Sequence, residues 1–362
     1  MVPALDPARI RSVFVRAPNW LGDVVMATPS FARIRSYFIE ARIVCGAKAG
    51  HLPILAGSRS FDDTLPLRRA RGWRGFRAEV RALREQRFDL AILFPNSPST
   101  ALQCLLAWIP YRMGYTQGRR LLITHGIKAR PARRRDGKRY GPRRVPVPMP
   151  LYYAALFDAF GFPACDTRPI LRVTPDEERR AGELFARLGI GPDERVVLLN
   201  PGAAFGPSKL WPGERWARLA EALHAELGPG HRLLLLVGPG EEGLAREILG
   251  LSRAPILAPL EPLIPLDVLK PVVRRGALMV TTDSGPRHLA VAFRVPHVVL
   301  MGPTHPDYTS AHTEEGTVLR HEVDCGPCHL PRCPLDHRCM GLITVEEVLA
   351  AARARLAGGD GR

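Results

Sequence analysis

Hydrophobic segments of strand length alternate with segments of helix length, and this alternation begins twice along the chain. In the first run the candidate strands are residues 13–18, 41–47 and 90–96, and a helix is expected over residues 22–37. Strands joined by helix-length connections are typical of a parallel sheet, because parallel strands need a long crossover between them. The first run therefore predicts one parallel α/β sheet.

The second run is longer, and its strands end in turns that contain glycine or proline. Its candidate strands are residues 194–202, 231–240, 254–260, 277–285 and 296–304. Helices are expected between them, over residues 216–227 and 242–249. The sequence thus predicts an α/β protein of two doubly wound, Rossmann-like domains, residues 1–172 and 173–362. In such sheets ligands bind beyond the carboxyl ends of the strands.

Two common nucleotide-binding motifs are missing from the sequence. No GxGxxG opens a first strand-to-helix turn and no GxxxxGK[ST] is present, which argues against nicotinamide dehydrogenases and P-loop ATPases. Arg294 and Pro296 interrupt the longest apolar run, well short of the roughly 18 to 20 residues of a membrane span. The first residues lack the layout of a signal peptide, so a cytoplasmic location is expected.

Basic residues are concentrated in the N-terminal half. Residues 1–175 carry 30 Lys+Arg and 11 Asp+Glu, a net charge of +19, and the remainder has a net charge of −3. The densest part, residues 118–146, favours a phosphate-rich partner: nucleic acid, an anionic membrane or a phosphorylated glycolipid. A solvated arginine-rich loop is the alternative. The candidates for a basic surface are Arg119, Arg120, Arg133, Arg134 and Arg135.

An acid stands at the first strand-to-helix turn, within residues 18–30, "PNWLGDVVMATPS". Gly22 relieves this turn and Asp23 opens the helix. Asp23 could be an N-cap, which is very common and contributes roughly 1 kcal/mol. It could also act as a base, and Asp23 alone does not decide between the two.

The second domain supplies candidate partners for a phosphate. Residues 200–212, "NPGAAFGPSKLWP", place Gly202 in a small-residue turn that a ligand can approach closely, and Lys209 adds a positive charge. Glu241 or Glu242 could bind a ribose hydroxyl, or either could simply interact with a helix N-terminus. Of the two, Glu242 is taken as the site residue.

Residues 281–290, "TTDSGPRHLA", end a strand and start a helix. Ser284 or Gly285 can cap this helix, and the free N–H groups of its first turn can bind an anion. His288 is then placed to bond a phosphate or a sugar, although a histidine that faces the sheet is a serious alternative. A carboxylate in one domain and a phosphate cradle in the other suggest group transfer from a nucleotide-sugar donor.

Four segments together resemble glycosyltransferase family 9. They are "PNWLGDVVMATP", "NPGAAFGPSKLWP", "TTDSGPRHLAVAFRVPHVVLMGPTHPDYT" and "CGPCHLPRCPLDHRCM". The resemblance covers nearly the whole chain in the motif order of the family. It implies a GT-B architecture, in which two Rossmann-like domains face a cleft. It also implies inverting transfer of L-glycero-D-manno-heptose from ADP-heptose to a heptose of the lipopolysaccharide inner core, with no metal or other cofactor.

The resemblance also implies residue roles. By position, Asp23 is the base and Lys209 is the contact to the diphosphate. Asp283, Ser284, Gly285 and His288 form the turn that holds the diphosphate and its sugar. The basic N-terminal half is expected to bind the lipopolysaccharide acceptor, made of lipid A, Kdo and heptose, and the anionic face of the inner membrane.

Other activities are compatible with parts of this pattern. Another sugar-nucleotide transferase or a non-hydrolysing epimerase has the same two-domain layout. A nucleic-acid-binding protein would explain the basic segment, but it leaves the phosphate-cradle turns unexplained, so no nucleic-acid partner is expected. Residues 99–110, "STALQCLLAWIP", fit a core helix better than an apolar surface element.

Four cysteines near the C-terminus follow the spacing C-x2-C-x4-C-x5-C. They are Cys325, Cys328, Cys333 and Cys339, with two histidines among them. Four thiols this close could bind zinc, but the usual paired CxxC spacing is absent. A structural role is therefore the main expectation, and no metal site is predicted.

Overall fold

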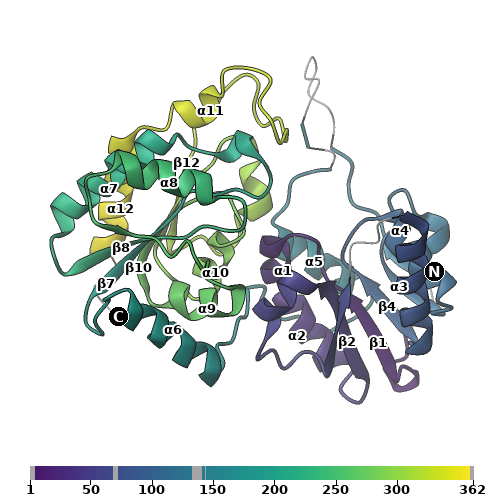
Figure 1. Cartoon of the computed structure of the whole chain (residues 1–362). Coiled ribbons are helices and arrows are strands. Elements are labelled where there is room, and N and C mark those ends of the chain that lie inside the picture. Colours follow the sequence, from purple (N-terminus) through teal and green to yellow (C-terminus); the bar gives the residue numbers. More distant parts are fainter. Residues whose placement is uncertain (1–4, 68–71, 133–140, 143, 359–362) are drawn as a thin grey trace. The chain divides into compact units, whose positions relative to one another are not determined.

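The computed structural model describes residues 5–67, 72–132, 141–142 and 144–358, which form two compact units. The N-terminal unit holds the residues up to 132 together with 144–172, and the C-terminal unit holds residues 141–142 and 173–358. Figure 1 shows one sheet in each unit with helices around it. Within the described ranges, no helix is both long and apolar enough to cross a membrane.

The sheet of the N-terminal unit is entirely parallel, in the order β3-β2-β1-β4-β5-β6. Its strands are β1 (Ser12–Arg16), β2 (Arg42–Lys48), β3 (Asp63–Leu67), β4 (Leu90–Leu93), β5 (Tyr111–Tyr115) and β6 (His125–Ile127). Its α-helices are α1 (Leu21–Met26), α2 (Thr28–Tyr37), α3 (Gly72–Glu85), α4 (Pro98–Leu106) and α5 (Met149–Asp158). Short 3-10 helices span Pro7–Arg9, Ala49–Leu55 and Arg120–Leu122.

The sheet of the C-terminal unit repeats the same topology, in the order β12-β11-β10-β7-β8-β9. Its strands are β7 (Arg195–Asn200), β8 (His231–Leu235), β9 (Ile256–Leu257), β10 (Gly276–Thr282), β11 (His297–Leu300) and β12 (Gly316–Leu319). Its α-helices are α6 (Pro175–Arg187), α7 (Gly213–Leu227), α8 (Glu242–Leu251), α9 (Leu266–Arg274), α10 (Arg287–Ala292), α11 (Arg338–Gly341) and α12 (Val345–Ala357). Short 3-10 helices span Pro207–Lys209 and Pro306–Thr309.

Both sheets have the strand order of a Rossmann fold, so the predicted fold class is confirmed. In each sheet the strand order reverses beside the first strand, between β1 and β4 in one unit and between β7 and β10 in the other. Ligands of doubly wound sheets bind at this switch point, outside the carboxyl ends of the strands. The fold therefore marks one expected ligand position in each unit.

The helix expected over residues 22–37 is instead two helices, α1 and α2, which divide at Ala27. Pro29 lies in the first turn of α2, where its missing N–H costs nothing but where it cannot continue a preceding helix. The hydroxyl of Thr28 donates to the carbonyl of Val25, 2.7 Å away, and so satisfies the end of α1. The break leaves α1 as a short helix of six residues that carries Asp23 in its first turn.

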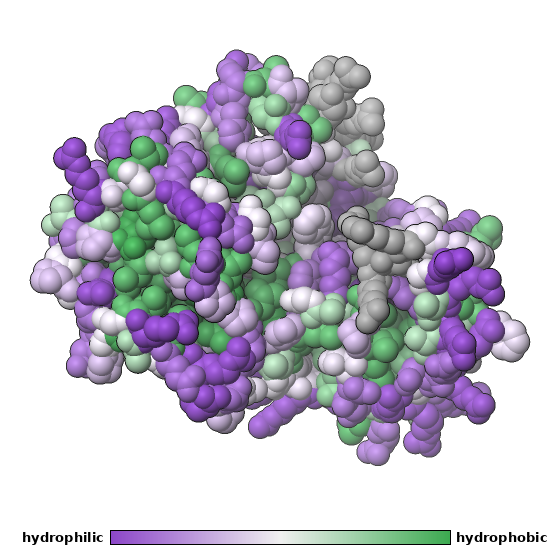
Figure 2. Space-filling view, viewed as in Figure 1, coloured by the Kyte–Doolittle hydropathy of each residue, from purple (hydrophilic) through white to green (hydrophobic). Residues whose placement is uncertain are grey.

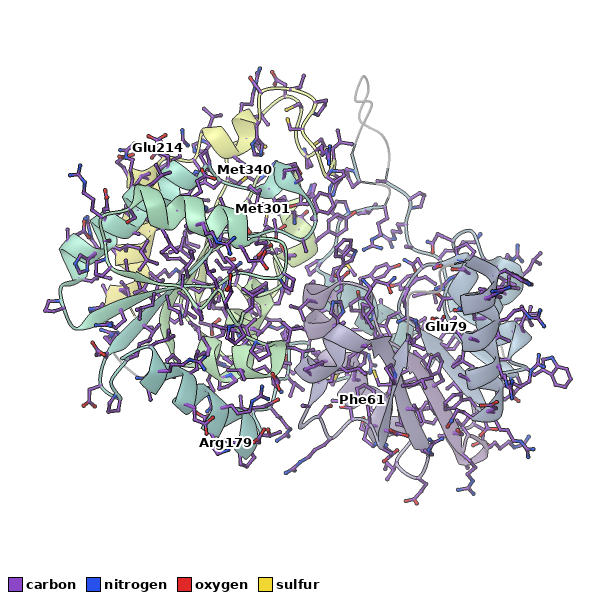
Figure 3. The ribbon with its side chains drawn as sticks, in the orientation of Figure 1. Phe61, Glu79, Arg179, Glu214, Met301 and Met340 are labelled. Carbon is purple, nitrogen blue, oxygen red and sulfur yellow. The ribbon has the colours of Figure 1, made fainter. Side chains whose placement is uncertain are left out.

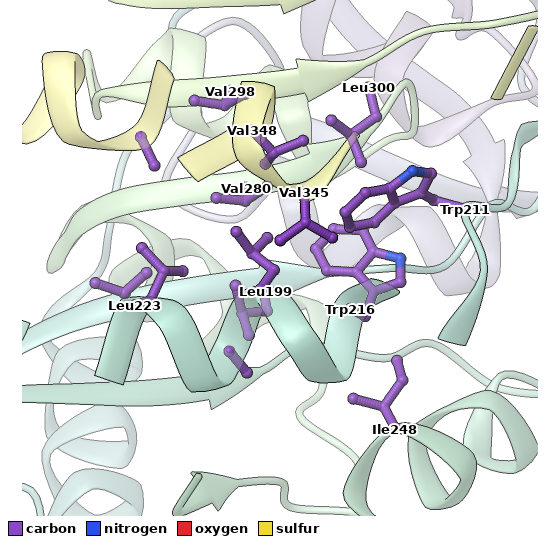
Figure 4. Packing of buried hydrophobic residues seen from close by; sticks show 14 of the residues in the cluster. Leu199, Trp211, Trp216, Leu223, Ile248, Val280, Val298, Leu300, Val345 and Val348 are labelled. Carbon is purple, nitrogen blue, oxygen red and sulfur yellow. The ribbon is translucent and has the colours of Figure 1, made fainter. Parts of the chain in front are cut away.

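Two tryptophans lie in the core of the C-terminal unit, between its sheet and the helices α7 and α12. Trp211 and Trp216 meet edge to face at 5.4 Å, among strand residues such as Leu199 and Val280 (Figure 4). The indole N–H of Trp211 donates to the carbonyl of Ile343 at 3.0 Å. Large buried aromatic rings contribute strongly to core stability and fix one packing arrangement. This core holds the strands whose ends carry the candidate donor residues.

Candidate functional site

The residues that follow β1 and β4 line a pocket of about 330 Å³ in the N-terminal unit. Asp23 and Trp20 come from the start of α1, Asn96 follows β4, and Arg144 and Tyr152 come from the segment that leads into α5 and from α5 itself. This is the switch point of the first sheet. The pocket therefore has the position that the fold predicts for a ligand.

Asp23 lines this pocket and is not the N-cap of its helix. Trp20 occupies the N-cap position of α1 and makes no side-chain capping bond, so Asp23 is the third residue of the helix. Burial and, next, the negative charge of Asp23 raise the pKa of Tyr153. Gly22 is buried beside Asp23. The carboxylate thus lines the pocket and does not serve as the helix cap.

Aromatic and amide groups form the wall around the carboxylate. The rings of Tyr115 and Tyr152 stack at 3.9 Å, and the amide of Asn96 donates to the hydroxyl of Tyr152 at 2.8 Å. The guanidinium of Arg144 lies 4.1 Å from the centre of the Tyr152 ring. A pocket lined with an acid, an amide, a hydroxyl and a guanidinium suits a polyhydroxylated, partly anionic ligand.

Arg119 is part of the support of this pocket and does not lie on a basic surface. It is 3% exposed, and its guanidinium donates to the carbonyls of Tyr115, Pro95 and Ser97 at 2.7, 2.6 and 3.3 Å. Burial lowers the pKa of Arg119 to about 10. Its neighbour Arg120 is exposed. The other candidates, Arg133, Arg134 and Arg135, lie outside the described residues.

In the C-terminal unit, a buried ion-pair cluster joins the two segments that were expected to bind a donor. Lys209 is 8% exposed, and its ammonium donates to the carboxylate and the carbonyl of Asp283 at 2.6 and 2.7 Å. The other carboxylate oxygen of Asp283 pairs with Arg287 at 3.0 Å, and Thr304 donates to Asp283 at 2.7 Å. Asp283 therefore positions two cations.

The electrostatics agree with this role for Asp283. Burial alone would raise the pKa of its carboxyl, but Lys209 and Arg287 hold the pKa well below its usual range. The sequence prediction gave Asp283 to the donor itself and did not include Arg287, although Arg287 stands four residues further on in the same motif. The spacing i, i+4 across a turn is the signal that could have identified this pair.

Side chains also connect the Gly202 turn to the turn at residues 283–288. The amide of Asn200 donates to the hydroxyls of Thr281 and Ser284, each at 2.8 Å. The hydroxyl of Thr282 donates to the carbonyl of Gly202 at 2.5 Å. These segments end β7 and β10, the two strands at the switch point of the second sheet. The structure thus brings Gly202, Lys209 and Ser284 to the carboxyl edge of one sheet.

The helix after this turn begins later than expected, and its cap is different. Pro286 occupies the N-cap position of α10, which starts at Arg287, so neither Ser284 nor Gly285 is the cap. His288 is 6% exposed, and burial followed by the charge of Arg287 lowers its pKa to about 3. His288 is consequently a neutral, buried imidazole.

Glu241 lies closer to the Gly202 turn than Glu242 does. A Cβ added at Gly202 would lie 2.0 Å from a carboxylate oxygen of Glu241, so a larger residue there would displace this side chain. Glu241 also accepts from the N–H of Gly238 at 2.8 Å, and burial raises its pKa. Glu242 accepts from the N–H of Gly240. Sequence alone could not separate these adjacent glutamates.

Residues 76–338 match the family model of glycosyltransferase family 9 (heptosyltransferase). The chain belongs to glycosyltransferase family 9. It is 27% identical over 320 residues to lipooligosaccharide heptosyltransferase 2 of Haemophilus influenzae, which covers 85% of this chain and 88% of the relative. Lipopolysaccharide heptosyltransferase 2 of Escherichia coli is 27% identical over 320 residues, with 85% and 87% covered.

A solved structure with the same architecture is that of E. coli ADP-heptose lipopolysaccharide heptosyltransferase II. It matches with a TM-score of 0.75 and 25% identity over 97% of this chain and 100% of that one. The resemblance of the motifs to the family and the prediction of a GT-B fold are both confirmed. As a family 9 member, the chain is a glycosyltransferase of the heptosyltransferase family.

The four C-terminal cysteines of this family 9 member are free thiols that line one small pocket with Ser208. In the described part of the chain, no group of three or more His, Cys, Asp or Glu side chains is arranged to hold a metal ion. Burial and the neighbouring thiols raise the pKa of Cys339 to about 11. The thiols therefore lie beside Ser208, the residue that precedes Lys209.

Proposed function

We propose that this chain is an inverting heptosyltransferase that moves L-glycero-D-manno-heptose from ADP-heptose to a heptose of the lipopolysaccharide inner core. In this proposal residues 1–172 bind the acceptor and residues 173–362 bind the donor. The single observation that carries it is the pair of switch points: one presents Asp23 in an open polar pocket and the other presents a lysine held by a buried carboxylate.

The proposed reaction needs one base on the acceptor side. Asp23 takes the proton of the acceptor hydroxyl as its oxygen attacks the anomeric carbon of the donor. ADP then leaves from the opposite face of the sugar, so the configuration at that carbon is inverted. A correctly placed general base contributes typically 10²- to 10⁴-fold to such a step.

The leaving group needs positive charge on the donor side. An ammonium carries three N–H donors, and Asp283 takes two of those of Lys209. We assign the third to the diphosphate, whose charge grows as the glycosidic bond breaks. Because Lys209 is already fixed by Asp283, it needs no reorganisation when that charge develops. Ser284, Gly285 and His288 complete the proposed diphosphate and sugar contacts, and Gly202 with Glu241 or Glu242 lies at the ribose end.

The basic N-terminal unit is proposed to bind the phosphate- and carboxylate-rich acceptor and to hold the enzyme on the cytoplasmic face of the inner membrane. Arg120 is exposed, as are Trp73 and Trp108, at 67% and 77%. Basic and aromatic side chains together suit an anionic membrane interface. Figure 2 shows hydrophilic residues interspersed with hydrophobic ones on the visible face of the molecule.

Calorimetric titration of the purified protein with ADP, ADP-heptose and UDP-glucose, with EDTA present, tests the donor assignment. Binding of both adenine nucleotides without metal, and weak binding of UDP-glucose, is the expected result. Preferential binding of UDP-glucose would show that ADP-heptose is not the donor. Absence of all binding would refute the proposed donor site. Analysis of the product then separates this activity from the alternative, a family 9 transferase of the heptosyltransferase I or III type with another acceptor or donor.

A further inference from the structure

The cysteine segment, residues 324–338, crosses over the loop that carries Lys209. Ser208, the residue before this lysine, makes three hydrogen bonds to the segment. Its N–H donates to the carbonyl of Pro331 at 3.1 Å, and its hydroxyl donates to the carbonyl of Leu330 at 2.6 Å. The Nε2–H of His337 donates to the carbonyl of Ser208 at 2.6 Å. The segment therefore fixes the backbone next to the proposed diphosphate contact.

Close packing surrounds the middle of the cysteine segment and the residues that directly follow it. Gly206 has a φ of +144°, and a Cβ there would lie 2.4 Å from the carbonyl oxygen of Pro331. Directly after the segment, a Cβ at Gly302 would lie 2.6 Å from the sulfur of Met340 and 2.9 Å from that of Cys339. Figure 3 shows Met340 near Met301, which precedes this glycine. The absence of a side chain at these two glycines therefore allows close packing against the segment and against the residues that follow it.

His329 carries the second imidazole of this segment, besides that of His337. Its N–H donates to the carbonyl of Pro303 at 2.9 Å, its φ of +56° is left-handed, and its ring meets Tyr308 edge to face at 5.6 Å. Its Nε2 is buried and makes no hydrogen bond to another described residue. A buried polar atom without a partner costs about 1–3 kcal/mol, so such an atom calls for an explanation.

The surroundings of His329 point to an anionic ligand. Burial, then the charges of His305 and Lys209, lower the pKa of His329 to about 4, while Asp283 acts in the opposite direction. The imidazole is therefore neutral and lies within the electrostatic influence of the ion pair that forms the proposed diphosphate site. A neutral Nε2–H can donate to a phosphate oxygen beside a lysine without adding a like charge.

We propose that His329 is a donor-site residue whose Nε2–H binds the diphosphate of the nucleotide next to Lys209, and that the cysteine segment holds it there. This inference rests on the proposed function, because it takes the ligand to be a nucleoside diphosphate. It gives the cysteine segment a role in positioning, since the segment fixes the Lys209 loop and supplies a second diphosphate contact.

The test is calorimetric titration with ADP and with adenosine, which lacks the phosphates. His329→Ala is expected to weaken ADP binding by about 10-fold or more, as for a lost hydrogen bond to a charged group, and to leave adenosine binding unchanged. His329→Gln can place an amide N–H near the position of Nε2 and is expected to restore most of the ADP affinity. His321→Gln is the matched control, because His321 lies in the same C-terminal region and bonds to Glu347 at 3.2 Å.

Thermal unfolding of the same variants separates binding from a purely structural role. His329→Ala also removes the ring that meets Tyr308 edge to face, so its melting temperature is expected to fall modestly. His329→Gln should keep both the melting temperature and most of the ADP affinity. If wild-type protein binds ADP and His329→Ala binds it equally well, or if ADP and adenosine weaken alike, the inference is overturned. If wild-type protein itself fails to bind ADP, it is the proposed donor site that is refuted.

Discussion

Buried, positively charged side chains have different partners in the two units. In the N-terminal unit Arg112 and Arg119 donate to backbone carbonyls, and the buried Arg33 combines bonds to carbonyls with an ion pair to the exposed Asp158. In the C-terminal unit Lys209 and Arg287 pair with Asp283, and the fully buried Lys270 pairs with Glu177 at 2.9 Å. Carbonyls are neutral, so bonds to them leave the positive charge of an arginine in place, whereas Asp283 and Glu177 offset two of these three positive charges in the C-terminal unit. The opposite net charges of the two sequence halves thus have a structural counterpart.

The tryptophans of the two units differ in their exposure to solvent. Trp20, Trp73 and Trp108 of the N-terminal unit are exposed, whereas Trp211 and Trp216 of the C-terminal unit are buried in its core. The N-terminal unit therefore presents charge and aromatic surface to partners, and the C-terminal unit uses both kinds of group internally. This contrast is consistent with the proposed roles of the two units, acceptor binding by the N-terminal unit and nucleotide binding by the C-terminal unit.

The largest expected effect concerns the carboxylate on which the C-terminal cluster depends. Asp283→Asn should lower the free energy of unfolding by about 3–5 kcal/mol, because it leaves Lys209 and Arg287 buried without their counter-charge. Asp158→Asn in the N-terminal unit is the matched control. Its partner Arg33 also donates to the carbonyls of Phe162 and Ala154, so a loss of about 1 kcal/mol or less is expected. If the two variants lost equal free energy of unfolding in denaturant titrations, the proposed difference between the two units would be wrong.

The same carboxylate predicts a pH dependence. The pKa of Asp283 is lower in the folded protein than in the unfolded chain, so its stabilisation is fully present above the unfolded value of about 4 and is lost as the pH falls below it. The free energy of unfolding should therefore decrease on acidification below about pH 4. Asp283→Asn should reduce this slope, and an unchanged slope would remove Asp283 from the acid transition.

The next largest effect is kinetic and belongs to the other unit. Asp23→Asn should lower kcat by about 10² or more, as expected for loss of a general base, while ADP-heptose affinity stays near that of wild type. The reason is that Asp23 lines the pocket of the N-terminal unit and the donor residues lie in the C-terminal unit. Transfer assays and calorimetry on one preparation measure both values. Normal turnover would show that Asp23 is not the base and has only a structural role in the first turn of α1.

Lys209→Ala should weaken ADP binding by about 10-fold, the loss expected for one charged hydrogen bond. The variant also leaves Asp283 paired with Arg287 alone, so its melting temperature has to be measured beside its affinity. Arg274→Ala is a suitable control, since this exposed cation of the same unit pairs with Glu178 on the surface. An ADP affinity that does not change would remove Lys209 from the donor site.

Much of the fold and part of the site could be predicted because strand periodicity and glycine-rich turns are local signals. The sequence predicted ligand binding beyond the carboxyl ends of the strands, and the segments carrying Asp23, Lys209 and Ser284 do end or follow strands there. That these strands lie at the switch points is known only from the strand order of the structure. Strands such as β3 and β6 were missed, because β3 is mostly exposed at a sheet edge and β6 has only three residues. Short or exposed strands carry little hydrophobic pattern.

What could not be predicted depends on side-chain direction. Arg119 and Arg120 are identical neighbours, yet one is buried against carbonyls and the other is exposed. The predicted core helix, α4, buries Ala101 and Cys104 but leaves Leu105 exposed. Such differences arise from tertiary contacts between segments far apart in sequence. Composition treats these residues alike, and only the packing separates them.

The smallest expected effect tests whether the exposed aromatic surface of the N-terminal unit meets a membrane. Trp108 follows α4 with a φ of +63°, where glycine is usual, and the guanidinium of Arg84 lies 4.9 Å from its ring centre. Transfer of a large exposed aromatic ring with a neighbouring cation to an anionic membrane interface is favourable.

Cosedimentation with vesicles of anionic phospholipid should therefore show binding that weakens as salt is added, since a few exposed arginines supply the attraction. Trp108→Ala should reduce binding by about threefold or more, and Leu251→Ala, at an exposed apolar position of the C-terminal unit, should not. Binding that ignores salt, or an equal effect of the two substitutions, would mean that the contrast between the units concerns the soluble part of the acceptor alone. In that case the positive charge of the N-terminal unit would serve the sugar phosphates and carboxylates, and the exposed tryptophan would need another partner.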